Sequence, residues 1–311
     1  MPNTNEQILK GVIDTGSVTY GLLNPEQDRK FIRQTFEATN LRPLVRHVMR
    51  TAKTGEIDKI GIASRILRAK TEGTDDGYRG NPVFAQIQYA TKAVRIPWEI
   101  TEETLRENIE GQNLEEIITE LMTGQVGRDL EDLDLNGDEN ISPSATDYDF
   151  LKVNTGWIKQ IENGGHVVDR TGIDSGAMNI DAFYAGVKAM PNKYNNGKLR
   201  WVMSPHRRQE WYKYIVSQKL TVVGDVSDNR VENPAAIPTV EVATMPDDKI
   251  LLTDPKNLIE VTTYGTRIRK STEGKEAIMQ DKRFYVIHLD FDAVIEELDA
   301  TVIIKGLASI S

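Results

Sequence analysis

The hydrophobic pattern is clearest between residues 113 and 140, where apolar side chains recur at helical spacing. They return every three, four or eight positions, which predicts one helix over 113–135 with a single apolar stripe. The stripe consists of Leu114, Ile117, Ile118, Leu121, Met122, Val126 and Leu130. Asn136-Gly137 is a turn signal that ends the helix. At ~1.5 Å per residue the helix is roughly 35 Å long, so another layer of the protein has to pack along it.

The start of this helix carries capping and charge signals. Asn113 is expected to cap it, and Glu116 lies three residues on, where a capping box requires a glutamate. Glu115 adds negative charge at the positive end of the helix dipole. The solvent-facing side is expected to consist of Glu120, Arg128, Asp129 and Glu131. Gly124 and Gly127 predict a bend or a close contact, because glycine is unfavourable inside a helix.

Two extended runs before this helix predict a long hairpin over residues 54–98. The runs, 57–62 and 83–95, are rich in alternating apolar residues and flank the turn-rich segment TEGTDDGYRGNP. A two-stranded hairpin without a third strand is only marginally stable alone. We therefore expect it to pack against something else, and a second copy of the protein is the natural candidate.

The remaining segments mix helices and strands. Residues 1–23 are polar and rich in glycine, which indicates an arm, and Asn24-Pro25 predicts the start of a helix that runs to about residue 39. Residues 142–168 are expected to form loop and a short strand. Further helices are predicted within 101–108, within 174–190 with Asn179 as cap, and from 205; strands are predicted at 199–203, 239–244, 249–253, 258–268, 284–289 and 301–304. With helices early and strands late, the fold class is α+β.

Composition excludes several classes of protein. The chain has 311 residues, enough for one large domain or two smaller ones, and its net charge of −9 argues against a free-standing nucleic-acid-binding protein. It has no cysteine, which excludes disulfides, thiolate catalysis and cysteine-based zinc sites. No apolar run approaches the ~18 residues of a membrane span, and the first residues lack the apolar core of a signal peptide. We therefore expect a cytoplasmic protein that does not bind membranes.

Charge is distributed unevenly between the hairpin and the long helix. Residues 53–95 contain eight basic and five acidic residues, a local charge of +3, whereas 113–135 contains seven acidic residues and one basic residue. Opposite fields on separate elements favour contact between copies, although ordinary solvated charge is an equally strong interpretation. The residues expected to make such contacts are Arg65, Arg68, Lys70, Arg79, Glu115, Glu116 and Glu120.

One segment has a partial metal-binding pattern. Asp132, Asp134, Asn136 and Gly137 match positions one, three, five and six of a calcium-binding loop. Position twelve, which should be glutamate, is Pro143, and no helix is expected to follow. We interpret the segment as a polar helix end, and keep a metal-dependent hydrolase using loop 132–140 as an alternative hypothesis.

Patterns typical of enzymes do not occur elsewhere in the sequence. The four histidines, His47, His166, His206 and His288, form no ligand pair on a helix. The sequence contains no GxSxG nucleophile elbow and no GxxxxGK[ST] or GxGxxG phosphate loop. We therefore predict no catalytic, cofactor-binding or metal-binding residues, and expect a structural protein.

The order of these elements resembles the tailed-phage major capsid proteins of the Hong Kong 97 type. The resemblance covers nearly the whole chain, and it rests on the order of motifs that are individually weak. The residues that carry it are Ile96–Leu105 after the hairpin, Asn113–Asp138 as the "spine" helix, Leu199–Ser204, and Phe284–Lys305 as the closing strands.

The resemblance implies a subunit that forms pentamers and hexamers and closes an icosahedral shell around double-stranded DNA. Residues 54–98 would be the E-loop that reaches over a neighbour, and 1–39 would be the N-terminal arm with the first helix. The peripheral domain would comprise 40–53, 99–165 and 258–293, and the axial domain 166–257 and 294–311.

The resemblance also implies partners and a location. A separate scaffolding protein is expected because the arm is short, together with a portal protein; the shell would be a virion capsid assembled in the bacterial cytoplasm. Some relatives cross-link a hairpin lysine, but no flanking pattern at Lys70 supports this here. An encapsulin-like compartment that holds a cargo enzyme is the alternative within the fold, and a tail-tube or adhesion subunit is a further one.

Overall fold

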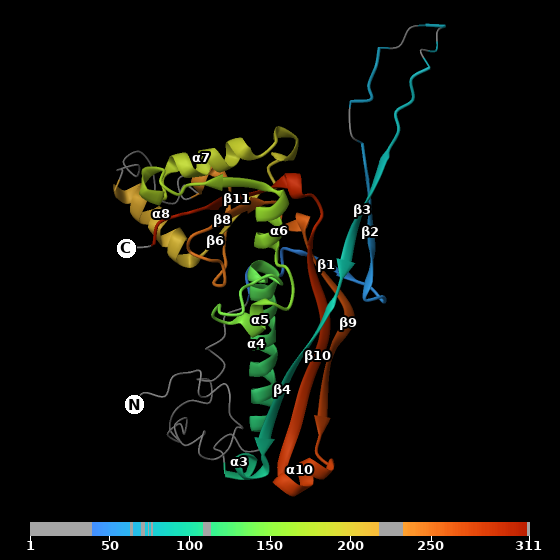
Figure 1. Ribbon diagram of the computed structural model, residues 1–311, viewed down its shortest axis with the longest axis vertical. Helices are drawn as coiled ribbons and strands as arrows, with labels where there is room; N and C mark the ends of the chain where they lie inside the picture. Colours follow the sequence, from blue (N-terminus) through green and yellow to red (C-terminus); the bar gives the residue numbers. More distant parts are fainter. Residues whose placement is uncertain are drawn as a thin grey trace.

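The computed structural model describes residues 39–62, 65–69, 72–73, 75, 77–107, 113–217 and 233–309. The predicted arm and nearly all of the helix expected at 24–39 lie outside these residues. The chain is elongated: helix α4 (Leu114–Asn136) runs beside a four-stranded sheet, and a lobe built on a five-stranded sheet lies at one end (Figure 1). None of the described helices is long and apolar enough to cross a membrane.

The four-stranded sheet has the order β1-β9-β10-β4, with β1 parallel to β9 and the other neighbours antiparallel. Its strands are β1 (Arg46–Met49), β4 (Lys92–Thr101), β9 (Leu258–Ser271) and β10 (Lys282–Ile295). Side chains alternate, so Trp98 and Ile287 are buried in the core shared with α4, whereas Arg95 on the opposite face is exposed. The short helices α3 (Glu102–Glu107) and α10 (Lys275–Gln280) lie at the far end of this sheet (Figure 1).

Helix α4 confirms the predicted helix to within one residue at each end, and the predicted stripe is buried or partly buried. Two expectations about it were wrong. The side chain of Asn113 makes no capping hydrogen bond, and Glu131, expected on the solvent side, is buried. Neither glycine is required by a close contact. A Cβ placed on Gly124 would have no neighbour within 4 Å, and a Cβ placed on Gly127 would lie at an ordinary contact distance of 3.7 Å from Arg42 Nη1. The helix continues unbroken past both glycines.

The second sheet has the order β5-β11-β8-β6-β7. Its strands are β5 (His166–Asp169), β6 (Arg200–Met203), β7 (Thr239–Glu241), β8 (Ile250–Thr253) and β11 (Thr301–Lys305). Helices α7 (Ile180–Ala189) and α8 (Pro205–Ser217) pack against it through Phe183, whose ring centroid lies 5.0 Å from those of Trp201 and Trp211. The predicted cap of α7 is confirmed, since Asn179 Oδ1 accepts a hydrogen bond from Ala182 N at 3.0 Å.

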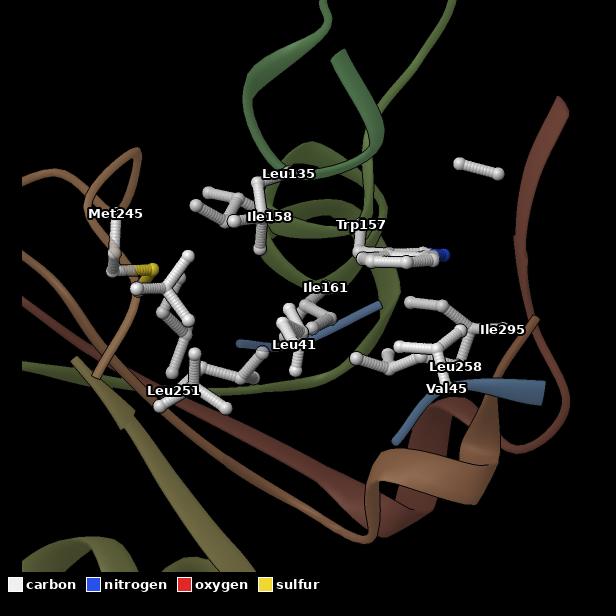
Figure 2. Packing of buried hydrophobic residues seen from close by; sticks show 14 of the residues in the cluster. Leu41, Val45, Leu135, Trp157, Ile158, Ile161, Met245, Leu251, Leu258 and Ile295 are labelled. Carbon is white, nitrogen blue, oxygen red and sulfur yellow. The ribbon is translucent and has the colours of Figure 1, made fainter. Parts of the chain in front are cut away.

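A helix that the sequence pattern did not predict joins the two sheets. Residues 142–168 were expected to be loop and strand, but they contain α5 (Tyr148–Leu151) and α6 (Trp157–Gly164). The buried side chains of α6 meet Leu41, Leu258 and Ile295 in one core (Figure 2). Trp157 Nε1 also donates a hydrogen bond to the carbonyl of Val294 at 3.1 Å. Short 3₁₀ turns are Asp174–Gly176, Asn192–Tyr194, Pro234–Ala236, Pro255–Asn257 and Leu298–Ala300.

Candidate assembly surface

A two-stranded ribbon projects from the body of the molecule (Figure 1). Strands β2 (Thr54–Gly61) and β3 (Val83–Ala90) pair antiparallel, from Thr54 opposite Ala90 to Gly61 opposite Val83. Within the part of the chain that is described, these strands form a sheet of two and join neither larger sheet. The predicted hairpin without a third strand is therefore present.

The ribbon is shorter than the expected hairpin because the run predicted at 83–95 is two strands. The break falls at Thr91, whose Oγ1 lies 2.9 Å from Thr263 Oγ1 and whose N–H donates to the carbonyl of Lys53 at 2.8 Å. After Thr91 the chain enters the four-stranded sheet as β4. Alternation in the sequence does not reveal this break, because both strands are extended and differ only in their partners.

The two faces of the ribbon meet different surroundings. On one face, Ile57 and Tyr89 are buried against Ile259, Val261 and Val294 of the body. Successive side chains of a strand point to opposite faces, so Ile60 and Phe84 lie on the other face. These two residues are cross-strand partners and are 67% and 71% exposed. An exposed apolar patch of this kind is typical of an interaction site.

The ribbon tip, whose described residues have no regular secondary structure, holds the predicted basic residues. The guanidinium of Arg68 lies 3.7 Å from the ring centroid of Tyr78, a cation–π arrangement. Arg79 forms an ion pair with Asp75 at 2.6 Å, and its hydrogen bond lowers the pKa of Asp75. Arg65 is exposed, whereas Lys70 lies outside the described residues.

The described acidic partners on α4, Glu115 and Glu120, differ in their surroundings and do not form one exposed acidic surface. Glu115 forms ion pairs with Lys270 and Arg283; partial burial opposes its charge, but hydrogen bonds from these partners lower its pKa. Glu120 is exposed, and the side chain of Glu116 lies outside the described residues. Among the described residues of these two groups, the structure brings no basic residue of the tip together with an acid of α4, so a contact between them would have to form between chains.

The calcium-like pattern at 132–140 does not produce a cage of oxygens. Asp132 Oδ1 accepts a hydrogen bond from Asn136 Nδ2 at 2.7 Å. Asp138 pairs with Lys159 at 2.8 Å, and Glu139 pairs with Lys92 at 3.3 Å. Among the described residues no group of three or more histidines, aspartates or glutamates is placed to hold a metal ion. Asp138 and Glu139 instead connect the end of α4 to α6 and β4.

Comparison with known proteins agrees with this architecture. No family model matches the chain. The chain is 29% identical over 300 residues to YqbE of Bacillus subtilis (strain 168), a protein described as a prophage capsid protein, covering 90% of this chain and 91% of YqbE. Over nearly its whole length, this chain is similar to a phage capsid protein. The expected resemblance is confirmed at this level, and it extends over nearly the whole chain.

Solved structures show that the fold is that of capsid subunits. A capsid chain of the empty GTA particle has a TM-score of 0.64 at 13% identity, covering 95% of this chain and 99% of that one. A chain from the satellite phage P4 procapsid has a TM-score of 0.62 at 15% identity, covering 87% and 96%. The SrpI encapsulin from Synechococcus elongatus PCC 7942 has a TM-score of 0.59 at 11% identity, covering 96% of each chain. The capsid fold is therefore shared with a protein compartment, and the relation to YqbE is what favours a phage capsid.

Proposed function

We propose that this chain is a major capsid subunit that forms pentamers and hexamers and closes an icosahedral shell around double-stranded DNA. The observation that supports this most directly is the ribbon of β2 and β3, which exposes Ile60 and Phe84 to solvent in the isolated chain. A two-stranded ribbon is only marginally stable by itself, and the face of this ribbon that carries Ile60 and Phe84 is not covered by the described part of its own chain. In a shell, a neighbouring copy would cover the exposed face.

The parts of the chain take distinct roles in this proposal. The ribbon, within 54–98, acts as the E-loop that lies over a neighbour. The four-stranded sheet with α4 forms the peripheral domain, assigned to 40–53, 99–165 and 258–293. The five-stranded sheet forms the axial domain near the centre of each capsomer, assigned to 166–257 and 294–311. The division of the strands between two sheets supports this assignment except at β4, which lies mostly within 54–98 but belongs to the four-stranded sheet.

Apolar burial contributes more to the proposed contact than charge does. Fully burying a phenylalanine or isoleucine side chain is worth about 1.5–3 kcal/mol each, whereas an exposed ion pair contributes about 0–1 kcal/mol. Arg65, Arg68, Lys70, Arg79, Glu115, Glu116 and Glu120 remain proposed contact residues. Their role would be to set the register between copies, because complementary charge steers and orients association.

The proposal also includes partners and a location. A separate scaffolding protein and a portal protein would assemble with the subunit in the bacterial cytoplasm, and the finished shell would be the virion capsid. The net charge of −9 suits a container from which DNA is released, because a strongly basic wall would hold the phosphate backbone. Binding of free DNA to shells at low salt tests this point, and weak binding is expected.

Electron microscopy of the purified protein, alone and co-expressed with the products of neighbouring genes, tests the proposed function. Rings of five or six copies, or closed shells, are expected. A protein that stays a monomer at high concentration under all these conditions would contradict the proposal. Nucleic acid inside purified shells would support a phage capsid, whereas a co-purifying enzyme would favour the encapsulin-like alternative.

A further inference from the structure

Three carboxyl groups are buried together beside a single guanidinium between α4 and the four-stranded sheet. Glu131 and Asp134 on α4 are 3% and 0% exposed, and Glu260 on β9 is 1% exposed. The guanidinium belongs to Arg42, in the turn that precedes β1. Its Nε and Nη2 donate to the two carboxylate oxygens of Glu260 at 3.2 and 2.7 Å.

Two of the three carboxyl groups have hydrogen-bond partners, and the third has none. Glu131 Oε1 accepts from the backbone N–H groups of Leu41 and Arg42 at 3.0 and 3.4 Å. Glu260 accepts from Arg42. Neither oxygen of Asp134 has a hydrogen-bond partner in the described part of the chain. An ionised carboxylate is costly to bury without hydrogen bonds, whereas a protonated carboxyl group costs much less.

The charges that surround Asp134 also disfavour its ionised form. Burial is the largest cause that raises the pKa of Asp134 well above its ordinary value, and the carboxylates of Glu260, Asp292 and Glu131 raise it further, against the opposing effect of Arg42. His47 on β1 contacts the cluster at two points, with Nδ1 3.1 Å from Glu260 Oε2 and Nε2 2.8 Å from the carbonyl oxygen of Arg42, and its side chain is about half exposed. Fully ionised, the three buried carboxylates would carry a charge of −3 beside the single positive charge of Arg42.

We propose that Asp134 carries a proton in the folded chain, and that this proton acts as a latch between α4, β9 and the turn at residues 41–45. Loss of the proton places a third buried negative charge next to one guanidinium. The repulsion acts between α4 and β9, the two layers that the cluster joins. The latch belongs to the single chain, so it stands whether or not the chain forms shells.

The latch predicts that alkaline conditions weaken the fold. A carboxyl group whose pKa is higher in the folded chain binds its proton more tightly there than in the unfolded chain. Its contribution to stability is fully present below the ordinary aspartate pKa of about 4, and falls as pH rises toward the folded pKa. Carboxylates with lowered pKa values, such as Glu102 and Glu115, have the opposite dependence. A variant at Asp134 separates the two effects.

The test compares urea unfolding of the full chain between pH 5 and 9 for wild type, Asp134→Asn and Glu120→Gln. Asparagine has nearly the shape of a protonated aspartate and cannot ionise, and Glu120 is an exposed acid on the same helix. The folding constant of wild type, divided by that of Asp134→Asn, is expected to fall by up to about tenfold per pH unit. Glu120→Gln should follow wild type. Parallel wild-type and Asp134→Asn curves would overturn the proposal.

A second measurement keeps the test decisive if Asp134→Asn does not fold. Aspartate labelled with ¹³C at the side-chain carboxyl reports each group by NMR as pH is changed. In the wild-type chain, one aspartate resonance is expected to titrate well above the ordinary aspartate range around 4. If every aspartate titrates within that ordinary range, Asp134 is ionised in the folded chain and the latch does not exist.

Discussion

Ile60 and Phe84 face each other across the ribbon, on the opposite face from Ile57 and Tyr89. The buried pair anchors the base of the ribbon to the body, and the exposed pair is left for a neighbour. One face of the ribbon thus packs on its own chain, and the other face is the one that we propose packs on a neighbouring chain. This relationship separates the stability of the subunit from its assembly, so the two can be changed independently.

Replacing Phe84 with aspartate is expected to prevent assembly without unfolding the subunit. The charge would have to be buried in the contact between copies, whereas in the single chain it stays in water. Electron microscopy and sedimentation should show free subunits, with a melting temperature close to wild type. Ala85→Asp is the matched control, because it puts the same charge on the opposite face beside Lys59. Shells that form normally from Phe84→Asp would refute the assigned contact.

Replacing Thr91 with valine is expected to weaken the joint between ribbon and sheet. The hydroxyl contacts Thr263 Oγ1 and the carbonyl of Lys53, and its removal should lower the free energy of unfolding by about 1–2 kcal/mol. Chemical denaturation measures the change. Thr54→Val, on the exposed start of β2, serves as the control and should change stability by less than about 0.5 kcal/mol.

Replacing Trp157 with alanine is expected to destabilise the junction of the two sheets by about 3–5 kcal/mol, because a large buried side chain leaves a cavity. Trp157→Phe should cost less, since most of the volume remains and mainly the hydrogen bond to Val294 is lost. Thermal and urea unfolding give both values. Tyr184→Ala, which removes an exposed ring from α7, should be nearly neutral. Equal losses of stability for Trp157→Ala and Tyr184→Ala would show that burial of Trp157 does not stabilise the junction of the two sheets.

The ion pairs of Arg283 predict a loss of stability in acid. Arg283 pairs with Glu102 and Glu115, and the hydrogen bond from Arg283 is the main cause of the lowered pKa of Glu102. A lowered folded pKa gives stability that is present above the ordinary glutamate pKa and is lost as pH falls through the folded pKa.

Melting curves of Arg283→Met between pH 3 and 7 test this dependence. The variant should be less stable than wild type near pH 7, and the difference should shrink toward pH 3. Arg106→Met is the control, because its ion pair with Asp281 is 71% and 68% exposed on the two sides and contributes little. A difference that is independent of pH would show that packing of Arg283 matters and its charge does not.

The sequence predicted most of the regular elements because their signals are local. The apolar stripe of α4, the cap at Asn179 and the alternation of the late strands each depend on neighbouring residues. Trp157, Ile158 and Ile161 have the spacing of a helix, so α6 could also have been predicted. The glycines and polar residues around them are typical of a loop, which is what was predicted instead.

What the sequence could not predict depends on partners far away along the chain. Glu131 was predicted on the solvent-facing side of α4, and Asp134 in a polar helix end, because α4 carries polar residues next to its apolar stripe. They are buried because the turn at Leu41 and strand β9 pack on that side of the helix, separated from it by about 90 and 130 residues. The break at Thr91 has the same origin, since only pairing with β10 distinguishes β4 from the ribbon.

The two sheets are connected by very little chain. Strand β10 ends at Ile295 and β11 begins at Thr301, and α6 wedges its tryptophan into the corner between them. Such a corner cannot bend freely, because any change of angle would open a void around Trp157. In the proposed shell, where five-fold and six-fold neighbourhoods differ in curvature, the rigid corner would leave the adjustment to the ribbon that projects before Thr91.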